Sequence, residues 1–315
     1  YLANTIGSMA AADGPLLSGL PTGNYLIFGG SSNDQAVAGK LFTDLVGPVK
    51  EALAEVEDGD LLIDYVDIIE TQATATESTT FGMMAPQGAV GASPLIQTVA
   101  ITEGDAEQLL DVTKKSATML PKLMGSFAEA AGQPAPPVDI NVEEGAREVD
   151  GVAFTKISTG MQQGDPMVAM MTNMVFGPEG QASFVGTSGG KLIAVQGMSD
   201  EQISGVLGAI EAGGAPLADV TNVQAVAAML PEGRSGEFYV DIDEIGRTIL
   251  NIGRQFGQQV PIELPDDVPP LGIAAGSAED SIEIGAFVHK DLVSAIIVAS
   301  IQAQQMQGGG MGGGL

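Results

Sequence analysis

The stretch GTSGG at Gly186–Gly190 has the Gly-x-Ser-x-Gly pattern that holds a nucleophilic serine on a sharp turn in hydrolases. Such a serine needs a base, and the chain's one histidine, His289, is far along the sequence. The stretch lies between two short runs of alternating apolar residues, which predicts a hairpin turn. We therefore expect Ser188 to be a turn residue and predict no catalytic residue, with a hydrolase as a remote alternative.

Four methionines in DPMVAMMTNM recur at the spacing of one helical face. Their thioethers could hold Cu(I), since soft ligands select soft ions. No histidine or cysteine accompanies them, so a flexible packing stripe is the better interpretation. A third interpretation, an adaptable apolar surface for a ligand or partner, stays open. The residues are Met167, Met170, Met171 and Met174.

The stretch DIDEIG at Asp241–Gly246 matches a calcium-binding loop at its first, third and sixth positions. The fifth position is Ile245, and no glutamate follows at the twelfth, so two ligands of that loop are missing. We expect Asp241 or Asp243 to cap the free amides of the next helix instead. No metal site or cofactor is predicted, apart from weak Ca²⁺ binding by surface carboxylates.

Composition narrows the range of partners. The chain has 12 Lys and Arg against 40 Asp and Glu, a formal net charge of −28, and no cysteine. Nucleic acid is not an expected partner, because binding a polyanion needs clustered cations. No apolar run approaches the roughly 18 residues of a membrane-spanning helix, so no span is expected. The missing cysteines exclude disulfides and a cysteine nucleophile.

Apolar periodicity predicts strands alternating with helices. Capping boxes are expected at Ser199 with Gln202 and at Thr221 with Gln224, and Asn33 or Asp34 should cap the helix that follows them. The strands are expected at 24–30, 79–85, 94–101, 138–144, 151–158, 236–242, 271–280 and 281–289, with a hairpin at 181–197. The helices are expected at 33–56, 60–72, 104–120, 199–210, 221–229, 243–257 and 290–305.

Two similar phrases, LPTGNYLIFGG from Leu20 and LPEGRSGEFYVDI from Leu230, begin the same order of strand, helix, strand pair and helix. An internal duplication is the favoured interpretation, and chance reuse of an ordinary helix stop is the alternative. The predicted fold is α+β, with antiparallel sheets and helices packed on one face. The expected units are 1–133, 134–220 and 221–306, followed by a glycine-rich tail at 307–315.

The phrases MLPEGRSGEFYVDIDEI and PPLGIAAGSAEDSIEIGAFV, together with the closing helix and the glycine–methionine tail, resemble exported bacterial proteins of unknown function that are frequent in planctomycetes. That resemblance rests on turns and strands along the whole chain. It implies no catalytic residues.

The first functional hypothesis is a non-enzymatic exported protein, periplasmic or on the cell surface, that assembles with its own copies through sheet edges and termini. The second is a periplasmic carrier or binding module for an apolar ligand such as a lipid, held against the methionine-rich segment. In the first hypothesis the tail could lie in a groove of a neighbouring copy. That tail comprises Gly308, Gly309, Gly310, Met311, Gly312, Gly313, Gly314 and Leu315.

Overall fold

The computed structural model describes residues 11–12, 14–56, 59–86, 93–134, 138–161, 166–177, 179–255, 257, 268–278 and 281–309. Within these residues, ten strands form a single antiparallel sheet in the order β10-β9-β8-β1-β2-β3-β7-β6-β5-β4. The predicted α+β class with antiparallel strands is therefore confirmed.

The described strands are β1 (Tyr25–Ser32), β2 (Thr76–Met84), β3 (Gln97–Gly104), β4 (Val138–Val149), β5 (Val152–Met161), β6 (Ala182–Ser188), β7 (Lys191–Gln196), β8 (Arg234–Val240), β9 (Leu271–Ala278) and β10 (Ser281–Phe287). The described helices are α2 (Gln35–Leu53), α3 (Gly59–Ala75), α4 (Ala106–Ala130), α5 (Pro166–Phe176), α6 (Asp200–Glu211), α7 (Thr221–Ala227), α8 (Ile242–Gln255) and α9 (Lys290–Gly309).

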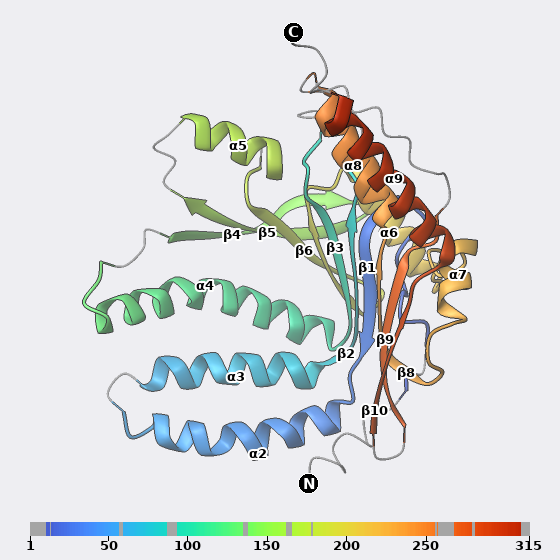
Figure 1. Cartoon of the computed structure of the whole chain (residues 1–315). Coiled ribbons are helices and arrows are strands. Elements are labelled where there is room, and N and C mark those ends of the chain that lie inside the picture. The colour runs from blue at the N-terminus through green and yellow to red at the C-terminus, as the bar shows by residue number, and fades with distance from the viewer. Residues whose placement is uncertain are drawn as a thin grey trace.

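The sheet is strongly twisted. In Figure 1, β4 and β5 run roughly horizontally, whereas β8, β9 and β10 run roughly vertically. Helices α2, α3 and α4 form a layer beside the sheet, with α3 packed between the other two. Helices α8 and α9 lie at the opposite side of the molecule (Figure 1). This arrangement leaves part of one sheet face between two groups of helices.

Local signals in the sequence account for several helix starts. The Asp34 carboxylate accepts hydrogen bonds from the amides of Ala36 and Val37, so Asp34 is the cap of α2. Asn33 has another role, because its amide donates to carbonyl oxygens of Ala73 and Thr76 and ties β1 to α3 and β2. The capping box of Ser199 and Gln202 is confirmed at α6.

The capping box predicted at Thr221 is wrong. Helix α7 begins at Thr221 itself, and its N-cap is Val220, which has no side-chain hydrogen bond to the helix. The physical reason is burial. The start of α7 is fixed because Val223 and Val226 pack into the core beneath it. Apolar packing can place a helix start without a polar cap.

One face of the sheet carries the main core, and we call it the covered face. Phe28, Ile193 and Tyr239 are almost fully buried there. Helices α6 and α7 supply the opposing side chains, including Ile203 and Val226, both 0% exposed. Burial of such residues contributes roughly 1.5–3 kcal/mol each, so this face is the stabilising centre of the fold.

We call the other side the open face. Helix α4 covers one end of it, where Leu109 packs against Val185 and Leu192. Helices thus lie on both faces of the sheet, whereas the sequence analysis predicted helices on one face. The helical stripe of α4 shows that the helix packs, but it cannot show on which face, because the strands offer apolar residues to both sides.

Two three-stranded meanders, β1–β2–β3 and β8–β9–β10, meet where β1 pairs with β8. Strand β1 pairs antiparallel with β8, and β2–β3 and β9–β10 extend the sheet in opposite directions from that pair. After its first strand, one meander is interrupted by α2 and α3 and the other by α8, and each is followed by a helix, α4 or α9. This arrangement agrees with a duplication, which, like the division into the units 1–133, 134–220 and 221–306, stays a prediction.

Candidate functional site

The central strands alternate between two environments. On β3, Val99 and Ile101 are each 1% exposed on the covered face, whereas Thr98 and Ala100 are half-exposed on the open face. Antiparallel sheets with one face in water usually place polar residues at such half-exposed positions. Here most of those positions are apolar, namely Ile27, Phe81, Met83, Ala100, Ala194 and Phe238.

A cavity of about 390 Å³ lies on this open face, and we call it the trough. Its volume is within the range of small-molecule sites. Its lining runs across six neighbouring strands, from β8 to β6. The side chains that point into it are Ile27, Phe81, Met83, Thr98, Ala100, Ser183, Ala194, Gln196 and Phe238.

Small residues create the space of the trough. Ala100 and Ala194 are paired in the sheet register and form its floor. Gly29 lies in the same row, opposite Phe81 and Phe238. A Cβ on Gly29 would lie 2.5 Å from the Glu237 carbonyl oxygen, so the close approach of β8 requires glycine there. Phe81 and Phe238 flank Gly29 in this row, and their rings, with centroids 5.9 Å apart, form a wall of the trough.

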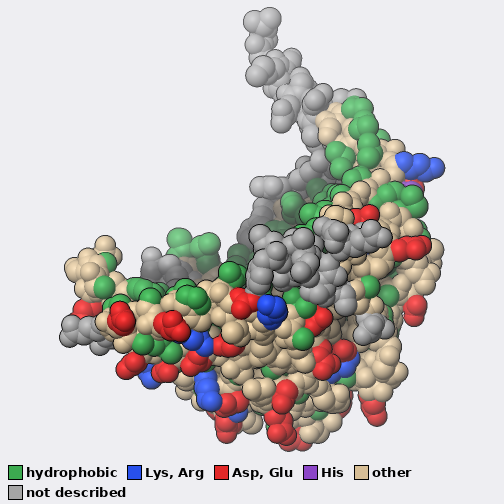
Figure 2. Space-filling model, turned by 90° about the horizontal axis from the view of Figure 1, so that it is seen from below, with side chains coloured by type: hydrophobic (Ala, Val, Ile, Leu, Met, Phe, Trp, Pro, Cys, Tyr) green, Lys and Arg blue, Asp and Glu red, His purple; other side chains and the backbone are tan. Residues whose placement is uncertain are grey.

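The helices that border the open face also expose apolar side chains. Figure 2 shows the molecule hollowed between two arms, with hydrophobic side chains along the edges of the hollow and acidic side chains gathered on the outer surface. Exposed apolar patches of this kind mark interaction sites more often than isolated apolar residues do. The exposed residues include Leu45 and Val49 on α2, Leu120 and Phe127 on α4, Ile249 on α8, and Val293, Ile296, Ile297, Val298 and Ile301 on α9.

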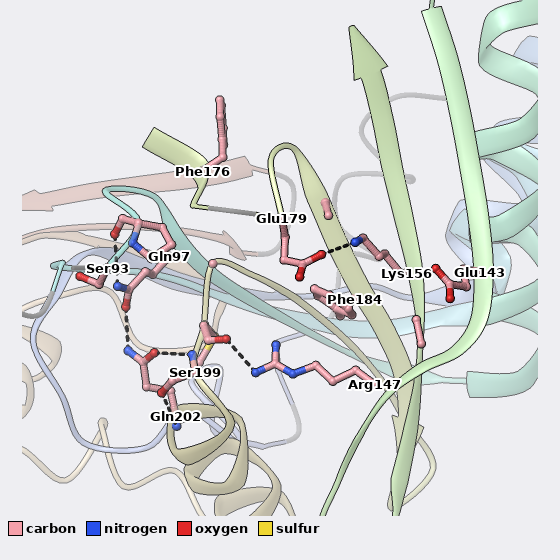
Figure 3. A pocket seen from close by; sticks show the side chains of 15 residues that line it. Ser93, Gln97, Glu143, Arg147, Lys156, Phe176, Glu179, Phe184, Ser199 and Gln202 are labelled. Atoms are coloured by element: carbon pink, nitrogen blue, oxygen red, sulfur yellow. Dashed lines mark hydrogen bonds and ion pairs between the residues drawn. The ribbon is translucent and has the colours of Figure 1, made fainter. Parts of the chain in front are cut away.

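A second cavity, of about 780 Å³, lies on the covered face between β4–β6 and the start of α6. Figure 3 shows that Arg147 and Lys156 approach this cavity from β4 and β5. Their cationic groups lie 5.1 and 5.9 Å from the centroid of the Phe184 ring, within cation–π range. We call this cavity the paired pocket, because both of its cations and its buried glutamine have protein partners.

The main polar groups of the paired pocket bind one another. Arg147 Nε lies 2.8 Å from Asp200 Oδ1, and Lys156 forms an ion pair with Glu179. The amide of Gln97, which is 1% exposed, accepts a hydrogen bond of 2.7 Å from Gln202 Nε2 (Figure 3). These contacts tie the sheet to α6. They give the pocket a structural role that uses both of its cations.

The structure separates the residues of the hydrolase pattern. Ser188 ends β6 and pairs with Lys191 across a turn in which Gly189 and Gly190 have positive φ, so the predicted hairpin is confirmed. His289 follows β10, the strand at one edge of the sheet. Its Nδ1 accepts a hydrogen bond from the Asp291 amide. These two residues belong to different parts of the fold and form no catalytic pair.

The methionine segment forms helix α5, but its packing interpretation is wrong for three of its members. Met167 and Met170 are each 66% exposed and Met171 is 53% exposed, while Met174 is half-buried. The helical spacing is real, yet these three side chains are exposed and form no buried stripe. Their role as a surface for an apolar ligand stays a prediction.

The acidic stretch at the start of α8 is a helix cap, as predicted. Asp241 Oδ1 accepts the amide hydrogen of Glu244 at 2.9 Å. Burial raises the pKa of Asp241 and also that of Glu244. Within the described residues, no group of three or more acidic or histidine side chains could hold a metal ion.

Only part of the predicted assembly tail lies within the described residues. Gly308 and Gly309 end α9, and residues 310–315 lie outside the described residues. Among the described helices, none combines the length and the hydropathy needed to cross a membrane.

Comparison with known proteins gives little further guidance. No protein-family model matches this chain, and no curated protein matches it. The structure of TP0453 in its crystal form III aligns with 90% of this chain and 86% of its own, at 10% identity and a TM-score of 0.33. A score that low supports no argument about fold or function. The resemblance to exported planctomycete proteins stays a prediction.

The sequence analysis missed the trough. Its residues come from β1, β2, β3, β6, β7 and β8, which lie far apart along the chain. One signal was present: YLIF at Tyr25–Phe28 and FGMM at Phe81–Met84 are continuous apolar runs and do not alternate. Such runs indicate strands that are covered on both faces. The described helices leave one of those faces open.

Proposed function

We propose that this protein binds a lipid with a long hydrocarbon chain in the trough and acts as a carrier or binding module for it. The observation that supports this most is the apolar lining of a half-exposed cavity on the open face. Water against such a surface is unfavourable by roughly 25 cal/mol per Å² of apolar area. A hydrocarbon chain would remove that contact, whereas a polar metabolite would not.

Charge supports the same proposal. Acidic side chains are spread over the outer surface that Figure 2 shows, and the formal net charge is −28. Copies of the chain therefore repel one another over most of their surface. The trough can stay open in solution because such repulsion opposes association through the apolar face.

The experiment is a titration of the lipid-free protein with a fluorescent probe that carries a long acyl chain. Ala100→Phe places a ring on the floor of the trough, and we expect it to weaken probe binding at least about tenfold. The matched control is Ala275→Phe, which makes the same change on the open face of β9, outside the trough. Equal binding by wild type and Ala100→Phe would contradict the proposal.

A second candidate function is self-assembly through β10. Within the described residues, β10 pairs only with β9, and its Ile282 and Ile284 are 51% and 75% exposed. The other edge strand, β4, carries many charged residues and an irregular register between Glu143 and Arg147. Charges and bulges protect an edge from pairing, and β10 has little of either.

Light scattering tests self-assembly directly. If β10 pairs with a second copy, the wild-type mass should rise with concentration and with salt, because salt screens the net charge. Ile284→Lys should keep the protein monomeric, since a lysine on an edge strand opposes pairing. A wild-type protein that stays monomeric at every salt concentration would rule this function out. Export to the periplasm or surface stays a separate prediction, which cell fractionation would test.

A further inference from the structure

The polar side chains of the trough lie in one row. Thr98 on β3 pairs with Gln196 on β7, which pairs with Ser183 on β6. The same row continues through Met83 on β2 to Ile27 on β1, and these side chains are apolar. The trough therefore has a polar end at β3–β7–β6 and an apolar end near β1 and β8.

These three polar side chains are available for a ligand. Each is half-buried, and within the described part of the chain none of them hydrogen-bonds to another residue. Gln97 makes the contrast clear, because it precedes Thr98 and its amide on the covered face is paired with Gln202. A half-buried hydroxyl or amide without a protein partner is satisfied by water or by a ligand.

The described lining of the trough contains no charged residue. A carboxylate or phosphate head would have to lose water there without meeting a cation, which is costly. The net charge of −28 would add repulsion. Hydroxyl and amide groups, by contrast, can both donate to and accept from an uncharged head.

We infer that the trough selects lipids with an uncharged head that forms hydrogen bonds, such as a hydroxyl or an ester. The head lies at Thr98, Gln196 and Ser183, and the chain crosses Ala194 and Ala100 toward Phe81. The six strands of the trough span about 24 Å at the usual spacing of strands, which suits a long alkyl chain. This inference deepens the proposed function and rests on it.

The test uses three probes with the same chain, namely dodecane, 1-dodecanol and dodecanoate, each displacing the fluorescent acyl probe at neutral pH. We expect 1-dodecanol to bind about two- to tenfold more tightly than dodecane for each hydrogen bond formed. Dodecanoate should bind more weakly than 1-dodecanol. Its affinity should rise as the pH falls and its carboxylate takes up a proton.

The variant combines Thr98→Val, Ser183→Ala and Gln196→Leu, and removes the polar row while keeping the trough's approximate size. We expect it to bind dodecane at least as well as wild type and to lose the preference for 1-dodecanol. Thr79→Val is the matched control, because Thr79 lies half-buried on the open face of β2, outside the trough. Circular dichroism during heating would check that each variant folds.

The outcomes separate the two proposals. If none of the three molecules, dodecane included, displaces the acyl probe from the wild-type protein, the proposed lipid-binding function fails. If dodecane binds as tightly as 1-dodecanol, or dodecanoate binds more tightly at neutral pH, lipid binding stands and the inference about the head is overturned. A triple variant that keeps the wild-type preference would also overturn it.

Discussion

Gln97 and Gln196 lie on adjacent strands but on opposite faces of the sheet. Gln97 is 1% exposed, and its amide is paired with Gln202 and with the carbonyl oxygen of Pro94. Gln196 is half-buried in the trough, without a hydrogen bond to any described residue. The two glutamines thus differ by face: the amide is paired on the covered face and available on the open face.

This difference separates polar groups that stabilise the protein from polar groups that are available to a ligand. The paired pocket is the larger cavity, about 780 Å³ against 390 Å³ for the trough. Its cations and its buried amide already have protein partners, so a ligand would have to replace them. The trough has apolar walls and unpaired polar groups, so a ligand would add contacts. Chemistry therefore favours the smaller cavity as the binding site.

The largest expected effect is a difference in stability between the faces. Ile193 is 0% exposed on the covered face, and Ile193→Ala should lower the free energy of unfolding by about 2–5 kcal/mol. Phe81→Ala removes a half-exposed ring on the open face and should cost much less, while weakening acyl-probe binding. Urea denaturation of both variants would measure this. Equal losses would show that the open face is an ordinary part of the core.

The two glutamines give a sharper comparison, and the expected difference in stability is of intermediate size. Gln97→Leu leaves the half-buried Gln202 amide with one partner fewer and should cost about 1–3 kcal/mol. Gln196→Leu removes no hydrogen bond within the described protein and should change stability by less than about 0.5 kcal/mol. Thermal and urea unfolding of the two variants would be compared with wild type. A loss at Gln196 as large as that at Gln97 would mean that Gln196 has a structural partner.

Local signals allowed most of the fold to be predicted. Strand and helix positions followed from periodicity, the start of α6 from its capping box, and the turn at Gly189 from its glycines. The order of the strands in the sheet could not be predicted, because β3 pairs with β7 only once distant segments are folded together. The trough depends on that pairing, since it brings Ala100 beside Ala194. For the same reason, no local motif in the sequence could predict the trough.

The methionines show a second limit of prediction. Helical spacing correctly gave α5, but spacing cannot show whether another element lies opposite the helix. Met167 and Met170 have the spacing of one helical face, yet each is 66% exposed. Exposure is a property of the assembled fold, whereas periodicity is a property of the segment alone.

The smallest expected effects concern pH, and they have opposite signs at two carboxyl groups. Burial would raise the pKa of Glu103 on the covered face, but its hydrogen bond and ion pair with Lys191 outweigh burial and lower the pKa. At Asp241, where α8 begins, burial raises the pKa. A lowered pKa stabilises the fold above the ordinary glutamate pKa of about 4.3, and this contribution is lost as the pH falls. A raised pKa costs stability once the pH exceeds the ordinary aspartate pKa of about 3.9.

Glu103→Gln should therefore lower the free energy of unfolding at neutral pH, and its difference from wild type should shrink as the solution is acidified. Asp241→Asn should raise that free energy slightly at neutral pH, because asparagine can still cap α8 without carrying the buried charge. Its difference from wild type should also vanish below about pH 3.9, where the aspartate is protonated in both states. Urea unfolding at several pH values would measure both. Effects of the same sign at the two sites would contradict the contrast between a paired carboxylate on the covered face and a desolvated one where α8 begins.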